Sequence, residues 1–295
     1  RSAAFIAPES ILCSSPMTHP ASDRPALTDR DALLRQRDRA RRGGLVDLFH
    51  QIAADEIEDR LAEVNRSFTA PALVTGFPEI WGPRFPQARV VADAPMLDLQ
   101  PGAHDLVIHA MSLHWADDPV GQIVQCRRAL HEDGLFLGVC FGNQTLAELR
   151  AALGQAEAEI RGGLSPRILP MGEIRDLGGL LHRAGLALPV ADLLHQRASY
   201  RDLPHLGRDL RGMGEGNAMA ARLRRPTARG VMGRAAQILA LHHPDRDDPS
   251  RVAVTFDLVF LTGWAPSDSQ PKPLRPGSAR TPLADALNDI RKKQQ

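Results

Sequence analysis

Four short apolar runs, each ending in polar residues, constrain the fold more than any other feature of the sequence. They are "PALVTG" at 71–76, "ARVVAD" at 88–93, "HDLVIHAMS" at 104–112 and "LFLGVCFG" at 135–142. Continuous apolar runs of this length are typical of strands buried on both faces of a parallel sheet. Because an amphipathic helical pattern at 119–134 separates the last two runs, the sequence predicts an α/β sheet with right-handed crossovers.

The flanking segments predict one domain with a helical addition. Helical spacing covers 29–43, 45–64, 145–163, 171–185, 203–218 and 229–243, and 186–200 reads as a strand pair or the entry to a strand. We expect residues 1–27 to be a disordered N-terminal segment, 28–268 to form a single domain, and 269–295 to be a Pro-rich, polar tail. Within the domain, we expect 145–250 to be a largely helical cap or insertion and 251–264 to be the last strand.

Composition argues against several classes of protein. With 36 basic and 35 acidic residues, no overall charge favours nucleic acid or an anionic membrane as the main partner. The basic run at 35–44 is typical of a solvated helix face. Three scattered cysteines fit neither a disulfide framework nor a tetrahedral metal site. No apolar run reaches the roughly 18–20 residues of a membrane span, and the first sixteen residues lack the pattern of a secretory signal.

Polar residues that follow the strands are the first candidates for a site. In an open α/β sheet, ligands bind outside the carboxyl ends of the strands. The loop at 112–118 places Ser112, His114 and Trp115 directly after a buried run. Its aspartates, Asp117 and Asp118, are expected to cap the following helix. For His114 and Trp115, a role in a site and a role in packing both remain open at this point.

A Gly-rich turn, "RGMGEGNA" at 211–218, is the other candidate. Arg211, Glu215 and Asn217 in this turn either belong to a helix stop or face a substrate or partner. No GxSxG elbow supports hydrolase chemistry. His242 and His243 have no further ligands at metal spacing, so we expect no metal site.

The run at 104–150 resembles the fourth-strand region of class I S-adenosylmethionine-dependent methyltransferases of the methyltransferase-11 type. It is still more similar to the methyltransferase-fold complex I assembly factors of mitochondria and alphaproteobacteria, which are related to the malonyl-carrier-protein methyltransferases of biotin synthesis. The segments 28–40, 157–192, 209–218 and 255–279 carry the same resemblance. The resemblance implies a Rossmann-like methyltransferase sheet and a location in the bacterial cytoplasm, or in the mitochondrial matrix if the source is eukaryotic.

The resemblance also implies a cofactor, a partner and roles for individual residues. The cofactor is S-adenosylmethionine, and the partner is a protein subunit of complex I. The implied cofactor-binding residues are Gly76, Asp93, Ala94, Ser112, Leu113, His114 and Trp115. His114 and Glu215 are candidate catalytic residues, while Arg211, Glu215 and Asn217 are expected to face the substrate or partner. The mitochondrial members of this family hydroxylate an arginine, yet the sequence shows no iron-binding facial triad.

The first strand lacks the glycine motif that intact relatives carry. Where they read roughly "ALDLGCGxG", this chain reads "ALVTGFPEI", which keeps Gly76 but places Pro78 at the second glycine. Proline offers no N–H and cannot adopt a positive φ. Residues 76–88 contain three prolines and two glycines, so they are not expected to form a crossover helix. We therefore expect a sheet shortened by about one β/α unit, with an irregular loop at 77–86 and with Trp81 and Phe85 packed over the gap.

Two ambiguities follow from the shortened motif. The run at 88–93 corresponds preferably to the third strand of the family, with the second strand lost; alternatively it is the second strand, with Asp93 as a ribose ligand. For function, one hypothesis is an enzyme that still binds S-adenosylmethionine through Asp93 and 112–115. The other is a non-catalytic assembly or binding protein that has lost the cofactor, and a carboxyl methyltransferase of biotin synthesis is a further alternative.

Overall fold

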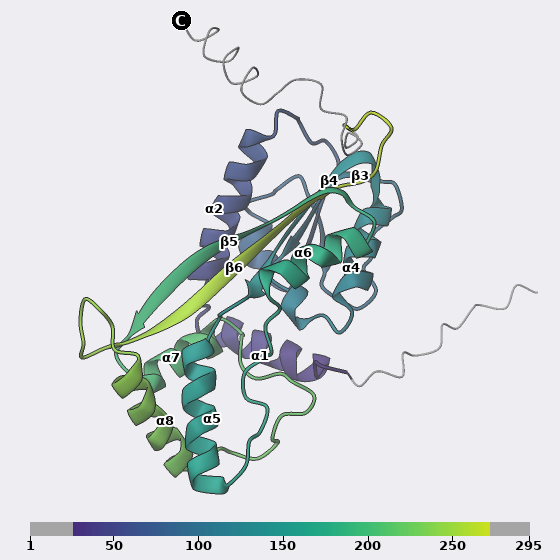
Figure 1. Ribbon diagram of the computed structural model, residues 1–295. Coiled ribbons are helices and arrows are strands. Elements are labelled where there is room, and N and C mark those ends of the chain that lie inside the picture. Colours follow the sequence, from purple (N-terminus) through teal and green to yellow (C-terminus); the bar gives the residue numbers. More distant parts are fainter. Residues whose placement is uncertain (1–25, 272–295) are drawn as a thin grey trace, which may run out of the picture.

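A computed structural model of the chain describes residues 26–271 and contains a six-stranded sheet (Figure 1). The strand order is β2-β1-β3-β4-β6-β5. β2, β1, β3 and β4 run parallel, and β6 and β5 are added antiparallel. The bounds are β1 (Pro71–Thr75), β2 (Arg89–Ala92), β3 (His104–Ala110), β4 (Leu130–Gly142), β5 (Ala187–Tyr200) and β6 (Val252–Trp264). The predicted α/β sheet of the Rossmann-like type is confirmed.

The described residues exclude most of the two ends of the chain. The expected N-terminal segment 1–27 and the tail 269–295 lie almost entirely outside residues 26–271, so both stay predictions. No helix within 26–271 is long and apolar enough to span a membrane.

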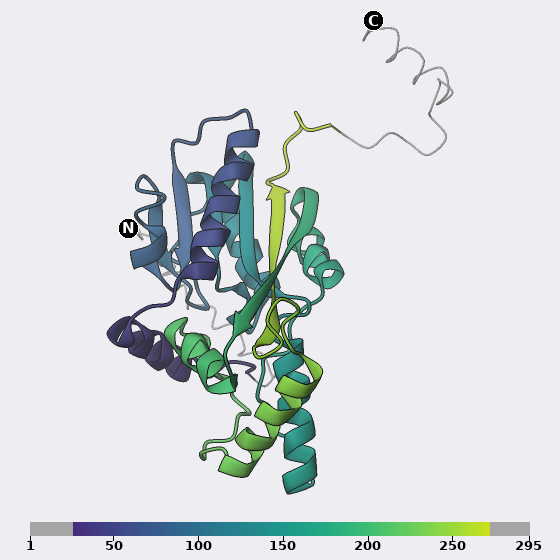
Figure 2. The same cartoon turned by 90° about the vertical axis from the view of Figure 1, so that its left-hand side faces the viewer.

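Helices cover both faces of the sheet, because successive strand residues point to opposite sides. They are α1 (Arg30–Gly43), α2 (Leu48–Glu63), α3 (Pro78–Trp81), the 3₁₀ helix η1 (Leu113–Trp115), α4 (Pro119–Ala129), α5 (Ala147–Arg161), α6 (Ile174–Arg183), α7 (Leu203–Gly212) and α8 (Arg229–His242). On one face Leu73 packs with Ile57 of α2, and on the other Val74 packs with Ile123 of α4 and Leu181 of α6. Figure 2 shows α2 and α6 on opposite sides of the sheet.

The segment 145–250 contains more strand than its sequence indicated. Residues 187–200 form one continuous strand, β5, which pairs antiparallel along most of β6 instead of forming a strand pair. The long β5 extends past the end of the sheet to α7, and β6 returns from α8, while α5 follows β4 and lies beside α8 (Figure 1). Ala156 of α5 and Ala235 of α8 share one cluster with the residues that α2 covers, so this addition continues the main core.

The connection between β1 and β2 is short, as the sequence predicts. Residues 78–81 form one turn of helix, α3, with Pro78 at its first position, so the expected loop at 77–86 is not wholly irregular. Trp81 is fully buried and stacks on Phe85 with ring centroids 6.2 Å apart. Its Nε1 donates to His50 Nδ1 of α2 at 2.9 Å, which confirms that Trp81 and Phe85 pack at this place.

Two sequence expectations change when strand positions are compared. The helix expected at 119–134 ends at Ala129, because Leu130 pairs with His104 and begins β4. β2 pairs directly with β1, the place that the second strand takes in the order 3-2-1-4-5-6. By position, the run at 88–93 therefore corresponds to the second strand, the alternative that we favoured less. One strand, rather than two, lies beyond β1 at this edge.

Candidate functional site

The carboxyl ends of the parallel strands meet at one edge of the sheet. Thr75 of β1 is in register with Ala92 of β2 and Ala110 of β3. The residues that follow, Gly76 after β1 and Asp93 after β2, therefore lie close together. The edge divides into two halves with different chemistry, one beside β1 and β2 and the other beside β3 and β4.

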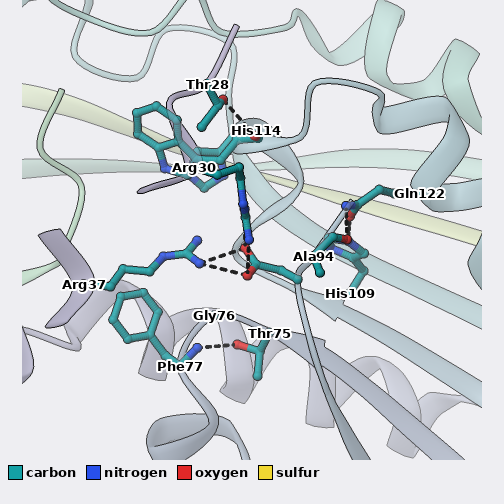
Figure 3. A network of polar contacts seen from close by, with 12 residues as sticks. Thr28, Arg30, Arg37, Thr75, Gly76, Phe77, Ala94, His109, His114 and Gln122 are labelled. Carbon is teal, nitrogen blue, oxygen red and sulfur yellow. Dashed lines mark hydrogen bonds and ion pairs between the residues drawn. The ribbon is translucent and has the colours of Figure 1, made fainter. Parts of the chain in front are cut away.

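Asp93, which follows β2, is held by two arginines of α1. Nη1 of Arg37 donates to both carboxylate oxygens, at 3.0 and 2.8 Å, and Nη2 of Arg30 donates to Oδ1 at 3.2 Å (Figure 3). The side chains of Arg37 and Asp93 are 1% and 4% exposed. Burial opposes ionisation of Asp93, but the two guanidinium groups outweigh it and hold the pKa of Asp93 below its usual range. Both oxygens of the expected cofactor ligand are thus engaged by the chain itself.

Arg37 also occupies the space beside Gly76. A Cβ atom built on Gly76 would lie 2.1 Å from Arg37 Nη1. The Gly76 carbonyl accepts a hydrogen bond from Arg41 at 2.6 Å, and the guanidinium carbons of Arg37 and Arg41 each lie 5.3 Å from the centre of the Phe77 ring. We term Arg37, Gly76, Phe77 and Asp93 the closed half of the edge.

The start of α1 is fixed so that its arginines reach this place. The amide of Asp29 donates to the carbonyl of Ala218 at 2.8 Å, and Thr28 Oγ1 donates to the carbonyl of Trp115 at 2.8 Å. Arg30 and Arg37 are seven residues apart, which is about two helical turns, so both face Asp93. We assigned the run at 35–44 to a solvated helix face, and for Arg37 this was wrong. The seven-residue spacing of Arg30 and Arg37 is visible in the sequence, but only the fold shows that both side chains face Asp93.

The second half gathers His114, Trp115 and Glu215. His114 and Trp115 belong to η1 after β3, and Glu215 comes from the Gly-rich turn after α7. Trp115 Nε1 donates to Glu215 Oε2 at 2.8 Å, and His114 Nε2 lies 3.2 Å from the same oxygen. Burial opposes ionisation of Glu215, yet His114, Arg37 and Trp115 together lower the pKa of its carboxyl. The two candidate catalytic residues, which are 101 positions apart, are thus in contact.

Several buried polar atoms in this half have no hydrogen-bond partner within the described part of the chain. They are Ser112 Oγ, His114 Nδ1 and Glu215 Oε1, and they are joined by Nε and Nη2 of Arg37 in the closed half. Buried polar groups in proteins are normally paired, so such a cluster points to a ligand or to water. We term Ser112, His114, Trp115 and Glu215 the open half of the edge.

A pocket of about 270 Å³ adjoins the open half. Trp115 and Glu215 line it, and most of the remaining wall is apolar, with Phe141 from β4 and Phe256 from β6. Arg167 also lines the pocket, but its guanidinium pairs with Glu157 at 2.7 Å. The Glu215 pocket, as we term it, therefore combines aromatic walls with one ionised carboxylate.

The other predicted site residues have mainly positional roles. Ala94 accepts a hydrogen bond from Gln122 Nε2 at 2.9 Å, and Leu113 is buried in the core on the α4 side of the sheet. Asn217 Nδ2 donates to the carbonyl of Pro166 at 2.9 Å, which joins the Gly-rich turn to the segment before α6. Arg211 is exposed at the edge of the Glu215 pocket.

The two aspartates of the loop at 112–118 have different roles. Asp118 caps α4, as expected, by accepting from the amide of Gly121 at 2.8 Å. Asp117 instead accepts from the amides of Leu27 and Thr28, both at 2.8 Å, and so anchors the segment before α1. The capping expectation is confirmed for Asp118 and wrong for Asp117.

Two histidines near the edge were missed by the sequence analysis. His50 of α2 accepts from Trp81, and burial lowers its pKa to about 4. His109 of β3 bonds through Nε2 to Gln122 Oε1 at 2.7 Å, so Nε2 carries the proton; burial lowers its pKa as well. His50 belongs to no motif, and His109 lies within the apolar run at 104–112, whose pattern does not single it out, so both positions follow only from packing.

The residues 26–271 contain no group of three or more His, Cys, Asp or Glu side chains placed to hold a metal ion. The turn at 140–145, which follows β4 at the same edge, serves the fold. Asn143 and the amide of Gln144 donate to Asp257 Oδ2 of β6 at 2.7 and 2.9 Å. His195 of β5 bonds to the other oxygen of Asp257 at 2.7 Å.

The sheet order and the edge define a methyltransferase-type domain, and comparison with known families agrees. Residues 49–138 match the methyltransferase-11 family model, described as a methyltransferase domain. The YcgJ protein of Bacillus subtilis is similar in structure, with a TM-score of 0.47 and 11% identity, covering 74% of this chain and all of that one.

Individual relatives show which methyltransferase-type proteins the chain is similar to. The chain is homologous to the mitochondrial protein named arginine-hydroxylase NDUFAF5: it is 37% identical to the Danio rerio protein over 71% of this chain and 64% of the relative. It is 34% identical to a malonyl-[acyl-carrier protein] O-methyltransferase of Laribacter hongkongensis, over 61% of this chain and 57% of the relative. The chain thus spans less than two thirds of the length of these relatives. The resemblance inferred from the sequence is confirmed.

The closed half does not fit S-adenosylmethionine as it stands. Binding of the cofactor's amino-acid end beside the first strand requires backbone N–H groups and free space at the turn. Pro78 removes one N–H, Arg37 fills the space beside Gly76, and Asp93 is already neutralised. Ser112 and His114 in the open half keep unpaired atoms, but they are only part of such a site.

Proposed function

We propose that this chain is a methyltransferase-fold binding protein that recognises an arginine side chain of a protein partner and assists the assembly of a complex I subunit. One observation carries the proposal: the buried, ionised Glu215 has one carboxylate oxygen without a partner, in a residue that lines an aromatic pocket. Homology to the arginine-hydroxylase NDUFAF5 proteins supports arginine as the recognised group and a complex I subunit as the partner.

Arginine fits the chemistry of the Glu215 pocket. Trp115 and His114 fix one oxygen of Glu215, so the carboxylate is oriented before any ligand arrives. A guanidinium group pairs with a carboxylate through charge-assisted hydrogen bonds and stacks on aromatic rings, which Trp115 and Phe141 provide. Of the two cations that line the pocket, Arg167 is largely compensated by its pairing with Glu157, and Arg211 lies exposed at the edge.

The same edge argues against methyl transfer. A methyltransferase needs its cofactor beside the reacting group, and the closed half is filled by the Arg37–Asp93 pair. We therefore take the cofactor as lost, and we infer that His114 orients Glu215 instead of accepting a proton from a substrate.

A second candidate is an enzyme that still binds S-adenosylmethionine after α1 moves away. The observation that favours it is the set of unpaired atoms in the open half, Ser112 Oγ and His114 Nδ1, at positions that flank the sulfonium in related proteins by resemblance. In that case the chain would act as a methyltransferase, on a complex I subunit or, like its biotin-synthesis relatives, on a carboxyl group.

Calorimetric titration separates the two candidates. The full chain is titrated with S-adenosylmethionine and with S-adenosylhomocysteine, up to millimolar concentration. We expect no heat of binding from either, and micromolar binding would overturn the non-catalytic proposal in favour of the enzyme. Deletion in the native cell that leaves complex I assembly unchanged would exclude the assembly role.

A peptide pair tests arginine recognition. One twelve-residue labelled peptide has a central arginine, and the other has the uncharged isostere citrulline. We expect the arginine peptide to bind more tightly, and Glu215→Gln to remove the preference, a loss of roughly tenfold to a hundredfold for a charged hydrogen bond. Glu173→Gln, at an exposed position before α6, is the matched control and should leave the preference intact. Equal binding of both peptides to the unmodified chain would contradict recognition of arginine.

A further inference from the structure

Three arginines line a groove between α1 and α7, two helices that pack side by side (Figures 1 and 2). A hollow of about 610 Å³ contains Arg39 of α1 with Arg208 and Arg211 of α7. A second hollow, of about 270 Å³, is also lined by Arg39 and Arg211. Because Arg211 lines the Glu215 pocket too, the groove leads to that pocket. We term Arg39, Arg208 and Arg211 the arginine groove.

These three side chains form no direct ion pair in the described part of the chain. All three are exposed, and none forms a side-chain hydrogen bond with any residue in the range 26–271, although Arg208 interacts electrostatically with Asp202, which caps α7. Nearby, Arg41 pairs with Glu79 at 2.6 Å and Arg42 pairs with Asp38 at 2.7 Å. These two arginines at the end of α1 are thus compensated by direct ion pairs, whereas the three groove arginines are not.

One carboxylate, that of Asp209, lines the larger hollow together with the arginines. His205 Nε2 lies 3.9 Å from its Oδ1, beyond hydrogen-bond distance, so Asp209 offsets one of the three positive charges of the groove. The chain as a whole carries 36 basic and 35 acidic residues, so the excess of positive charge in the groove is local. A local excess of one sign attracts and orients a partner of the opposite sign.

We propose that the arginine groove binds an acidic stretch of the partner protein that flanks the arginine entering the Glu215 pocket. This inference rests on the proposed function and names the sequence context of the recognised arginine. Arginine pairs with carboxylates through two parallel hydrogen bonds, which suits a Glu- or Asp-rich segment. Arg211 contacts both hollows, so the carboxylates of the segment are expected within a few residues of the arginine. A basic segment would be repelled by the groove even if its arginine fitted the pocket.

Fluorescence anisotropy of labelled peptides on the full chain tests this proposal. Three twelve-residue peptides share a central arginine and carry four glutamates, four glutamines or four lysines beside it. We expect the glutamate peptide to bind at least about tenfold more tightly than the glutamine peptide, with the difference shrinking at high salt, and the lysine peptide to bind most weakly. Equal affinity for all three peptides, or no binding of the glutamate peptide, would overturn the proposal.

A pair of charge-reversal variants locates the effect. Arg39→Glu/Arg208→Glu/Arg211→Glu changes the groove and should remove the preference for glutamate. The control Arg128→Glu/Arg175→Glu/Arg183→Glu alters three exposed arginines on α4 and α6, with the same change of net charge, and should keep it. Thermal melting confirms that both triple variants fold. If the control loses the preference as much as the groove variant does, the groove assignment is wrong.

Two further readouts separate this inference from its alternatives. Exchange of the central arginine for citrulline tests the Glu215 pocket alone. If the chain prefers glutamate peptides but does not prefer arginine over citrulline, the proposed function is wrong while the assignment of the groove stands. Vesicles of phosphatidylglycerol and phosphatidylcholine test a membrane instead. Groove-dependent binding to vesicles, with no groove-dependent binding of peptides, would replace the acidic segment with a lipid surface.

Discussion

The closed and open halves of the carboxyl edge lie side by side and differ in how their buried carboxylates are paired: both oxygens of Asp93 have partners within the chain, whereas Glu215 Oε1 has none in its described part. In the closed half, Asp93 makes ion pairs with Arg30 and Arg37, and Gly76 and Phe77 are packed against the same helix. In the open half, Ser112 and Glu215 keep buried atoms without partners.

The difference between the halves follows a difference between two stretches of the sequence, one that departs from the family pattern and one that keeps it. The glycine motif after β1 is broken at Pro78, and there the chain supplies its own cation and aromatic ring. The loop at 112–115 after β3 retains its family resemblance, and beside it a pocket remains. The buried acid Asp93 thus has the counter-charge that it requires, and the same arginine fills the space beside Gly76.

Arg37→Met should have the largest effect, because it leaves Asp93 buried with only the partly exposed Arg30 as a partner. Removing one member of a buried ion pair typically costs about 3–5 kcal/mol in the free energy of unfolding. Urea denaturation of the full chain measures this loss of unfolding free energy. In the double variant Arg37→Met/Asp93→Leu no charge is stranded, so most of the loss should be recovered. If the single variant unfolds like the unmodified chain, Arg37 does not close this half.

Low pH should reduce the free energy of unfolding through His50, whose ring packs against Phe77 of the closed half. Its pKa is lowered by burial from 6.5 to about 4, so the unfolded chain takes up a proton below pH 6.5 before the folded chain does. Stability attributable to His50 should thus fall as pH drops from about 6.5 to 4 and change little beyond, an effect of roughly 3 kcal/mol. His50→Asn keeps an acceptor for Trp81 and should flatten this part of the curve of unfolding free energy against pH. An unchanged slope would show that His50 is not the group responsible.

Gly214 tests how tightly the Gly-rich turn closes over α1. Its φ is +75°, and a Cβ there would lie 2.9 Å from Phe77 and 3.1 Å from the Arg37 side chain. Gly214→Ala should cost about 2–4 kcal/mol from backbone strain and overlap together. Gly233→Ala, in the exposed interior of α8 with open space around it, should instead stabilise the chain by about 0.5–1 kcal/mol. Equal effects of the two substitutions would mean that the turn is not packed as described.

The sequence predicted the sheet and the shortened first crossover because those features depend on local patterns. Apolar runs identify strands, and the prolines of 76–88 exclude a long helix whatever surrounds them. The same reasoning could not assign β5 as one strand or end the helix at Ala129, because pairing with β6 and β3 decides both.

The candidate site was predicted as a set of residues but not as two halves. His114 and Glu215 were both named, and their contact at 3.2 Å depends on a turn 101 residues away. Asp93 was assigned to a cofactor by family resemblance, which identifies the position but not whether the chain itself already pairs with the carboxylate. Arg37 was overlooked because a charged helical run is usually solvated, and only the tertiary contact with Asp93 makes it an exception.

Two buried hydroxyls, one in each half, allow a direct comparison in which the expected changes of unfolding free energy are the smallest. Thr75 Oγ1, in the closed half, accepts from the amide of Phe77 at 3.1 Å, so Thr75→Val strands a buried donor and should cost about 1–3 kcal/mol. Ser112 Oγ, in the open half, has no partner in the described chain, so Ser112→Ala should change the unfolding free energy by less than about 0.5 kcal/mol or raise it. Paired urea denaturations measure both. A large loss for Ser112→Ala would mean that its hydroxyl stabilises the fold, and the two halves would then not differ in their buried hydroxyls.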